Sequence, residues 1–168
     1  MINLTRTVRI LLVDDSEGFR SRVASILQNR PELKIVGTAA NGDEAVQTAE
    51  ELQPEMILLD LGLPGINGIE AARQILAVLP KCKVLFVTQN ESPVIAREAI
   101  RLGAHGFLVK TDCSRELLLG IEAVIAGSQF LSSRIAKRMG LASVQGVSWR
   151  IERQEHLNAN PPTFGQTQ

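Results

Sequence analysis

Five polar side chains stand at the ends of short apolar runs in the sequence: Asp14, Asp15, Asp60, Thr88 and Lys110. Apolar runs of about four to eight residues between turn signals are typical of strands that are buried on both faces of a parallel sheet. The polar residues would then lie at the carboxyl ends of strands. Ligands bind at that edge of open α/β sheets, so these residues are the candidates for chemistry.

The side chains in question suit phosphoryl chemistry if their strands are neighbours. Three aspartates would crowd one place, which is unfavourable unless a cation joins them, and carboxylate oxygens suit a hard divalent ion such as Mg²⁺. The Lys110 ammonium offers a point charge and the Thr88 hydroxyl a hydrogen-bond donor for the remaining oxygens of a phosphoryl group.

Simpler interpretations of the same residues are also open. Asp60 stands in front of a turn and could only cap local backbone N–H groups. Lys110 could form only a buried ion pair with Asp60, and Asp14 and Asp15 could only favour the start of the helix that follows them.

The surrounding sequence alternates between strand and helix signals, with short connections. Strands are expected at residues 8–13, 33–36, 56–59, 83–87 and 106–109. Helices are expected at about 17–29, 41–52, 67–79, 92–102 and 114–126. This alternation predicts a parallel sheet that helices cover on both faces.

The second expected strand offers no functional group at its end, which is Thr38-Ala39-Ala40. Placing that strand at the edge gives the order 2-1-3-4-5 and brings the other four strand ends side by side. We therefore predict an α/β fold of the flavodoxin-like (βα)5 type, a three-layer sandwich with its crevice between strands one and three.

Composition limits the class of protein. The 168 residues, 45% of them hydrophobic, suit one domain with a tail. Eighteen basic and eighteen acidic residues balance, so net charge gives no indication of binding to nucleic acid or an anionic membrane. No apolar stretch approaches the ~18 residues that span a bilayer. Cys82 and Cys113 lack metal-site spacing. We expect a soluble, cytoplasmic protein with reduced thiols.

Residues 6–127 resemble the receiver domain of two-component response regulators. The resemblance rests on four motifs: Leu12-Val13-Asp14-Asp15, the stretch from Asp60 to Gly68, Val87-Thr88, and the stretch from Gly103 to Lys110. Each motif alone is weak, but together they have the order and spacing of the family. The sequence is most similar to the subfamily that usually carries a C-terminal helix-turn-helix of the LuxR/NarL type.

The resemblance implies a phosphorylation site with a magnesium ion. Asp60 would be the phospho-acceptor, and Asp15 and Asp60 would be direct Mg²⁺ ligands. The Gly62 carbonyl would be a third ligand, and Asp14 would act largely through water. The implied phosphoryl donor is a sensor histidine kinase or a phosphotransfer protein.

The resemblance also implies a switch. Thr88 and Lys110 would bind the phosphoryl oxygens, and Thr88 and Phe107 would move together so that residues 92–126 present a changed surface. Two positions depart from the family pattern. Thr111 follows Lys110 where many receivers have proline, and Phe107 lacks the hydroxyl of a tyrosine at the switch position.

Three segments are expected. Residues 1–128 would form the receiver, 129–139 a helical linker extension, and 140–168 a polar, disordered tail. The linker helix would end in solvated basic residues: Arg134, Lys137 and Arg138. Residues 140–168 are too short and too polar for a helix-turn-helix, so direct DNA binding is not supported and no output domain is expected in this sequence.

The predicted function is a phospho-acceptor switch, not an enzyme that turns over a substrate. It would signal through a homodimer or a downstream protein and would not act at a membrane. One alternative is a receiver-fold module that works without phosphorylation. Another is a phosphatase with an aspartate nucleophile, but that chemistry needs its nucleophile after the first strand and an aspartate two residues later, where this chain has Ser16.

Overall fold

The computed structural model describes residues 6–141 and the backbone of residues 147–150. In chain order the elements are β1 (Val8–Val13), α1 (Glu17–Leu27), β2 (Leu33–Ala39), α2 (Gly42–Leu52), β3 (Met56–Leu59), α3 (Gly68–Val78), β4 (Lys83–Thr88), α4 (Pro93–Leu102), β5 (Gly106–Val109), the 3₁₀ helix η1 (Lys110–Asp112), α5 (Cys113–Ile125), β6 (Ser128–Leu131), α6 (Ser133–Arg138) and β7 (Val147–Arg150). The part of the chain that is described contains no helix long and apolar enough to cross a membrane.

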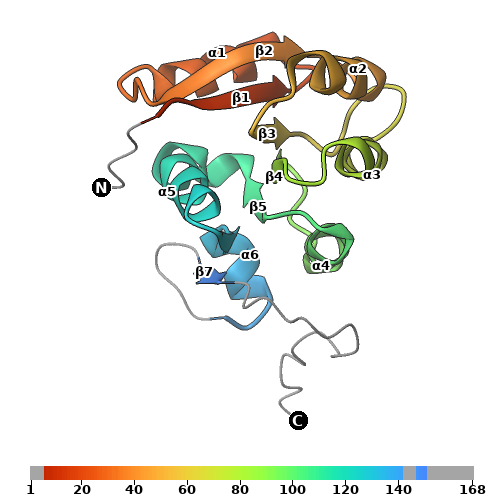
Figure 1. The fold of residues 1–168 in the computed structure, drawn as a ribbon. Coiled ribbons are helices and arrows are strands. Elements are labelled where there is room, and N and C mark those ends of the chain that lie inside the picture. Colours follow the sequence, from red (N-terminus) through yellow and green to blue (C-terminus); the bar gives the residue numbers. More distant parts are fainter. Residues whose placement is uncertain (1–5, 142–146, 151–168) are drawn as a thin grey trace.

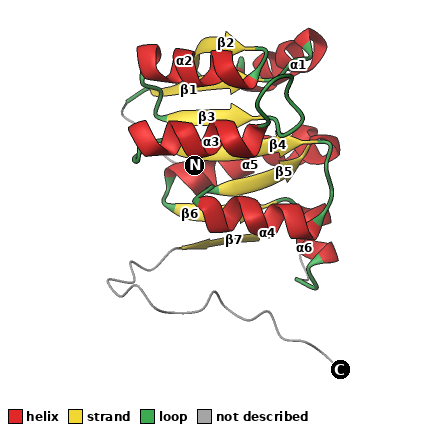
Figure 2. Cartoon of the chain, turned by 90° about the vertical axis from the view of Figure 1, so that its right-hand side faces the viewer, coloured by secondary structure: helices red, strands yellow, loops and turns green. Residues whose placement is uncertain are grey.

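The strands form one sheet in the order β2-β1-β3-β4-β5-β6-β7 (Figure 2). All neighbours are parallel except β6 and β7. Helices α2, α3 and α4 cover one face, with α6 beside α4, and α1 and α5 cover the other (Figure 1). The predicted three-layer α/β sandwich and its 2-1-3-4-5 order are therefore confirmed.

Both faces of each central strand are buried. In β1, Ile10 and Leu12 face the side of α1 and α5, whereas Leu11 and Val13 face the side of α2, α3 and α4. Successive side chains of a strand point to opposite faces, and a strand without polar positions must therefore be covered twice. This burial fixes the register: Val13 lies opposite Leu59, so the strand ends at Asp14 and Asp60 are brought side by side.

The sheet is wider than predicted. The expected helical extension at 129–139 is wrong for its first part, because Ser128–Leu131 is a strand and the helix occupies Ser133–Arg138. Strand β6 continues the sheet because β5 offers free backbone groups: Phe130 N–H donates to His105 O at 3.0 Å and Ser132 N–H to Phe107 O at 3.0 Å. This hydrogen bonding depends on the partner strand, so the short segment carries little strand signal of its own.

Glycines make room for β6. A Cβ on Gly120 of α5 would lie 3.0 Å from the Phe130 ring, and one on Gly106 of β5 would lie 3.0 Å from Phe130 O. The segment 140–168, expected to be a disordered tail, contains β7, an extended strand antiparallel to β6. Residues 142–146 and 151–168 of that segment, and residues 1–5, lie outside the described part of the chain.

Gly68 sets how closely α3 approaches the turn after β3. Its N–H donates to Leu61 O at 2.9 Å, and a Cβ there would lie 2.2 Å from Asp60 O and 2.7 Å from the Leu61 Cα. We predict that Gly68→Ala lowers the free energy of unfolding by about 2 kcal/mol or more, because backbone atoms must shift to admit the methyl group. Urea unfolding followed by circular dichroism measures this change.

The control for this prediction is Gly18→Ala, in the first turn of α1. A Cβ on Gly18 would meet only Ser16 Oγ, at 3.9 Å. Alanine in a helix is favoured over glycine by about 0.5–1 kcal/mol, so this variant should be at least as stable as the wild type. Equal destabilisation of both variants would contradict the close approach assigned to Gly68.

His105 is part of the pairing between β4 and β5. The Val84 N–H donates to His105 Nδ1 at 3.1 Å, which requires a neutral ring, and burial, with a smaller contribution from Lys83, lowers the pKa of His105 to about 4. The unfolded chain has a higher histidine pKa, so it binds more protons between about pH 6.5 and 4. Stability contributed by neutral His105 is therefore lost as the pH falls through this window.

We predict that this loss amounts to about 2–3 kcal/mol between pH 7 and pH 4. Denaturant unfolding at a series of pH values measures it. His105→Gln retains a polar acceptor but cannot take up a proton, so its unfolding free energy should fall less over the same range. Identical pH profiles for the two proteins would contradict the prediction.

Candidate functional site

The site lies at the carboxyl edge of the sheet, where four neighbouring strands end. Asp14 follows β1, Asp60 follows β3, Thr88 is the last residue of β4 and Lys110 follows β5. The backbone holds them in register, since the Asp60 N–H donates to Val13 O at 3.0 Å and Thr88 is paired with Val109. The structure thus brings together the side chains that the sequence placed at one edge.

Lys110 joins two of the strand ends. Its Nζ lies 2.6 Å from Asp14 Oδ2 and 3.1 Å from Asp60 Oδ2, and the latter contact is a hydrogen bond. Asp14 and Asp60 are both buried, and the Lys110 side chain is only 13% exposed. A buried carboxylate is costly unless it is paired, so this ammonium is needed for the site to exist without a bound ion.

The negative charge around Lys110 exceeds the positive charge. Burial raises the pKa of Asp14, and the negative charge of Asp60 adds to this, although Lys110 and the Ser16 N–H at 2.8 Å act in the opposite direction. For Lys110, burial acts to lower the pKa, but the attraction of the Asp14 and Asp60 carboxylates outweighs it and leaves the pKa raised. Lys110 is therefore charged at neutral pH, and one ammonium faces more than one carboxylate.

The three aspartates are placed to share a cation. Asp14, Asp15 and Asp60 each offer a carboxylate oxygen, and these oxygens all lie within 4.8 Å of one another. Asp14 Oδ2 is buried and accepts no hydrogen bond of acceptable geometry from the described residues, although the Lys110 ammonium is close. Oxygen ligands in this number, with an exposed side for water, fit a hard divalent ion such as Mg²⁺.

Beside the aspartates is an open cavity of about 670 Å³. It is lined by Asp15, Ser16, Asp60, Leu61, Gly62, Asn67, Ile69, Thr88, Gln89, Asn90, Ile95 and Lys110. Asp60 therefore borders solvent while its carboxylate is held from behind by Lys110 and by the Gly62 N–H, which donates to Asp60 Oδ1 at 3.3 Å. A purely structural ion pair would not need this access.

Thr88 ends β4, the neighbour of β3, and Phe107 lies on β5, the following strand of the sheet. The Thr88 hydroxyl oxygen accepts from the Asn90 N–H at 3.1 Å, and its own proton is free to donate into the cavity. Phe107 is completely buried, with its ring centroid 6.4 Å from that of Phe86. The two residues predicted to form a switch thus lie on adjacent strands, and Phe107 is part of the core.

Phe19 also belongs to the site, although its position in the sequence does not indicate this. Its ring centroid lies 4.3 Å from Lys110 Nζ, a distance at which the ring face stabilises the ammonium. From its spacing, Phe19 is one of the apolar residues along α1. Only the folded structure shows that the first turn of α1 lies over the end of β5.

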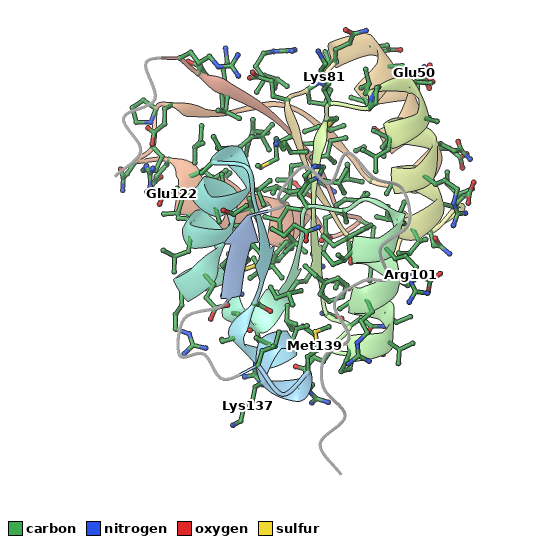
Figure 3. All side chains as sticks on the ribbon, turned by 60° about the horizontal axis from the view of Figure 1, so that its bottom comes forward. Glu50, Lys81, Arg101, Glu122, Lys137 and Met139 are labelled. Atoms are coloured by element: carbon green, nitrogen blue, oxygen red, sulfur yellow. The ribbon has the colours of Figure 1, made fainter. Side chains whose placement is uncertain are left out.

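Arg134, Lys137 and Arg138 are exposed, as predicted for a solvated helix end, but Arg134 and Arg138 also form ion pairs that the sequence does not indicate. Arg134 Nε lies 3.3 Å from Asp112 Oδ1, and Arg138 lies 2.8 Å from Glu91 Oε2. Lys137 points away from the body of the molecule, as Figure 3 shows. The acidic partners come from other loops, so their contact with α6 could not be seen in the sequence spacing.

Comparison with known proteins supports this geometry. Residues 10–122 match the family model described as the response regulator receiver domain. The response regulator GacA of Pseudomonas viridiflava is 35% identical over 138 residues, which cover 82% of this chain and 64% of that protein. The transcriptional regulatory protein LnrK of Bacillus subtilis is 34% identical, over 79% of this chain and 60% of that protein. The chain thus spans less than two thirds of the length of these relatives.

Two crystal structures show the same fold at similar identity. A two-component response regulator of the LuxR family from Aurantimonas sp. SI85-9A1 is 34% identical, with a TM-score of 0.73, and the match covers 79% of this chain and 97% of that one. The response regulator domain of Thermotoga maritima CheB is also 34% identical, with a TM-score of 0.66, over 72% and 98%. The chain belongs to the response regulator receiver domain family of two-component signalling, in which phosphoryl acceptance is standard.

Proposed function

We propose that Asp60 accepts a phosphoryl group from a phosphohistidine on a partner histidine kinase or phosphotransfer protein. A carboxylate oxygen of Asp60 attacks phosphorus, the P–N bond to the imidazole breaks, and the electron pair leaves with the ring nitrogen, which takes up a proton. The product is an acyl phosphate on Asp60. Nucleophilic carboxylates that form aspartyl phosphates are established chemistry.

The observation that carries the proposal is the combination of access and charge at Asp60. Its carboxylate borders the open cavity and lies 3.1 Å from the Lys110 ammonium, with Thr88 on the same cavity wall. The Lys110 ammonium would stabilise the negative charge that develops on the phosphoryl oxygens, and the Thr88 hydroxyl would donate a hydrogen bond to one of them. Both groups are in place before the donor arrives.

Mg²⁺ would be held by Asp15 and Asp60, with the Gly62 carbonyl as a further ligand and Asp14 acting through water. When bound, the ion neutralises charge on the carboxylates and on the transferred phosphoryl group. The close approach of the three carboxylate oxygens supports this assignment. Lys110 then has two tasks, which are to hold Asp14 and to bind the phosphoryl group.

Signalling would follow from a shift of population between two conformations. Bound phosphoryl would draw Thr88 inward, and Phe107 would change its packing against Phe86. The surface formed by residues 92–126 would change with them and would select a protein partner or a second copy of the chain. A ligand shifts such an equilibrium only by its difference in affinity for the two states, and the phosphoryl group supplies that difference through Lys110 and Thr88.

We predict one added phosphoryl group per chain after incubation with Mg²⁺ and a small acyl phosphate. Intact-mass spectrometry should show the adduct in the wild type and not in Asp60→Asn, because the amide is not a nucleophile. Lys110→Met should reduce the adduct strongly, since the charge on the phosphoryl oxygens is then unopposed. Absence of an adduct in every protein would instead favour a receiver-fold module that works without phosphorylation.

We also predict that Mg²⁺ raises the melting temperature of the wild type by about 2–6 °C at saturating concentration, because the ion binds the folded state only. Asp15→Asn should lose most of this increase and should be more stable than the wild type without the ion, since one repelling charge is gone. The matched control is Glu50→Gln, at an exposed position of α2 that Figure 3 labels. This variant should keep the full increase in melting temperature. Equal increases in all three proteins would place the ion elsewhere.

A further inference from the structure

Helix α6 lies against the side of the molecule formed by α4 and β5 (Figure 1). Ile135 and Ala136 are completely buried there, and Met139 is partly buried against the same core. Residues of α6 also make polar contacts at both of its ends, and the partners lie in η1, in α5 and in the loop between β4 and α4. These contacts are not needed for the phosphorylation site, so they call for an explanation of their own.

At its start, α6 is held by two buried acids. Glu116 of α5 accepts from the Ser133 N–H at 2.9 Å and from the Ser133 hydroxyl. Asp112, which is wholly buried at the end of η1, accepts from the Arg134 N–H at 3.4 Å and lies 3.3 Å from Arg134 Nε. Acids at a helix start are favoured by its free N–H groups and by its dipole.

At its end, α6 is held by Glu91 in the loop between β4 and α4. Glu91 lies 2.8 Å from Arg138 and 3.8 Å from Arg134. Arg134 thus lies between Glu91 and Asp112, and Arg138 adds a second contact to Glu91. We call these four residues, Glu91, Asp112, Arg134 and Arg138, the α6 clamp.

The acids of the α6 clamp stand in the two loops that begin at the phosphorylation site. Glu91 follows Thr88 in the loop after β4, and hydrogen bonds tie that loop together, from Asn90 N–H to Thr88 Oγ1 at 3.1 Å and from Ser92 N–H to Asn90 Oδ1 at 2.8 Å. Asp112 and Lys110 are the two ends of η1. A displacement of Thr88 or Lys110 would therefore move a short segment that carries an acid in contact with α6.

We propose that the α6 clamp is closed when Asp60 is unphosphorylated and opens when it is phosphorylated, so that α6 is the element that the receiver releases. The proposal rests on the function proposed above. New acceptors on Asp60 attract the Lys110 ammonium and the Thr88 hydroxyl, and their loops move with them. Glu91 then moves away from Arg138. An exposed ion pair contributes little to stability once its charged atoms are separated.

Release of α6 here means that α6 detaches from the receiver more often, and not that it is detached all the time. Ile135 is completely buried in the core and would remain an apolar anchor in both states. The backbone of α6 provides reporters: the Met139 N–H donates to Ile135 O at 3.0 Å and the Leu141 N–H to Ala136 O at 2.8 Å. Exchange of these amides with solvent deuterium measures the opening.

The test compares hydrogen–deuterium exchange of residues 133–141 in the full chain with Mg²⁺ alone and with Mg²⁺ plus beryllium fluoride, a phosphoryl mimic. Exchange in the wild type should become about three- to tenfold faster with the mimic. In Glu91→Gln it should be faster by about two- to fivefold without the mimic and should respond less to it. Because coupling is reciprocal, Glu91→Gln should also bind beryllium fluoride more tightly by a similar factor.

The matched control is Glu122→Gln. Glu122 forms an ion pair with Arg30, at 2.6 Å, on the opposite face of the sheet, and Figure 3 shows it on the outer side of α5. Its removal should leave both the exchange of α6 and the response to the mimic unchanged. A change as large as that of Glu91→Gln would show that any lost ion pair loosens α6, and would overturn the proposal.

Two further outcomes separate this inference from the proposed function. If intact mass shows phosphorylated Asp60 but exchange of α6 is unchanged or slower with the mimic, the α6 clamp is not a switch and the phospho-acceptor function stands. If neither an adduct on Asp60 nor binding of the mimic is found, the proposed function fails and this inference fails with it.

Discussion

The interaction on which the rest of the site depends is the contact of one ammonium with two buried carboxylates. Lys110 at the end of β5 reaches Asp14 and Asp60, which follow β1 and β3, and its side chain therefore passes over the end of β4. This is possible only if the strand order is 1-3-4-5 and the strands end at the same level. Burial of both strand faces sets that order and level, so the core of the sheet is what positions the charge.

The fold and most of the site could be predicted from the sequence because they rest on local patterns. Residues 10–13 before Asp14 and 56–59 before Asp60 contain no polar position, which indicates strands buried on both faces. The end of β2 carries no functional group, which indicates that β2 lies at the edge of the sheet. Glycine at position 68 and proline at position 93 mark helix starts. The carboxyl ends of parallel strands lie at the same edge of a sheet, so the polar residues that follow these strands are expected at that edge.

What could not be predicted depends on contacts between distant segments. Phe19 has the spacing of an ordinary core residue, and its position over Lys110 follows from the way α1 lies on the sheet. The strand β6 is short and exists because β5 offers it backbone partners. Arg134 and Arg138 carry charges that would be solvated on an isolated helix, and they find Asp112 and Glu91 only after α6 has docked.

The contacts of α6 divide into two kinds with different consequences. Buried Ile135 gives α6 its position, and full burial of such a side chain is worth about 1.5–3 kcal/mol. The pair between Glu91 and Arg138 is half exposed, and pairs of this kind are worth about 0.2–1 kcal/mol. A complete reversal of a two-state equilibrium needs about 5.5 kcal/mol of differential binding. A much smaller difference in binding free energy is enough to break a weak ion pair. Holding α6 by an apolar anchor and regulating it by exposed charges therefore lets a small movement of the Thr88 loop change its opening without unfolding the receiver.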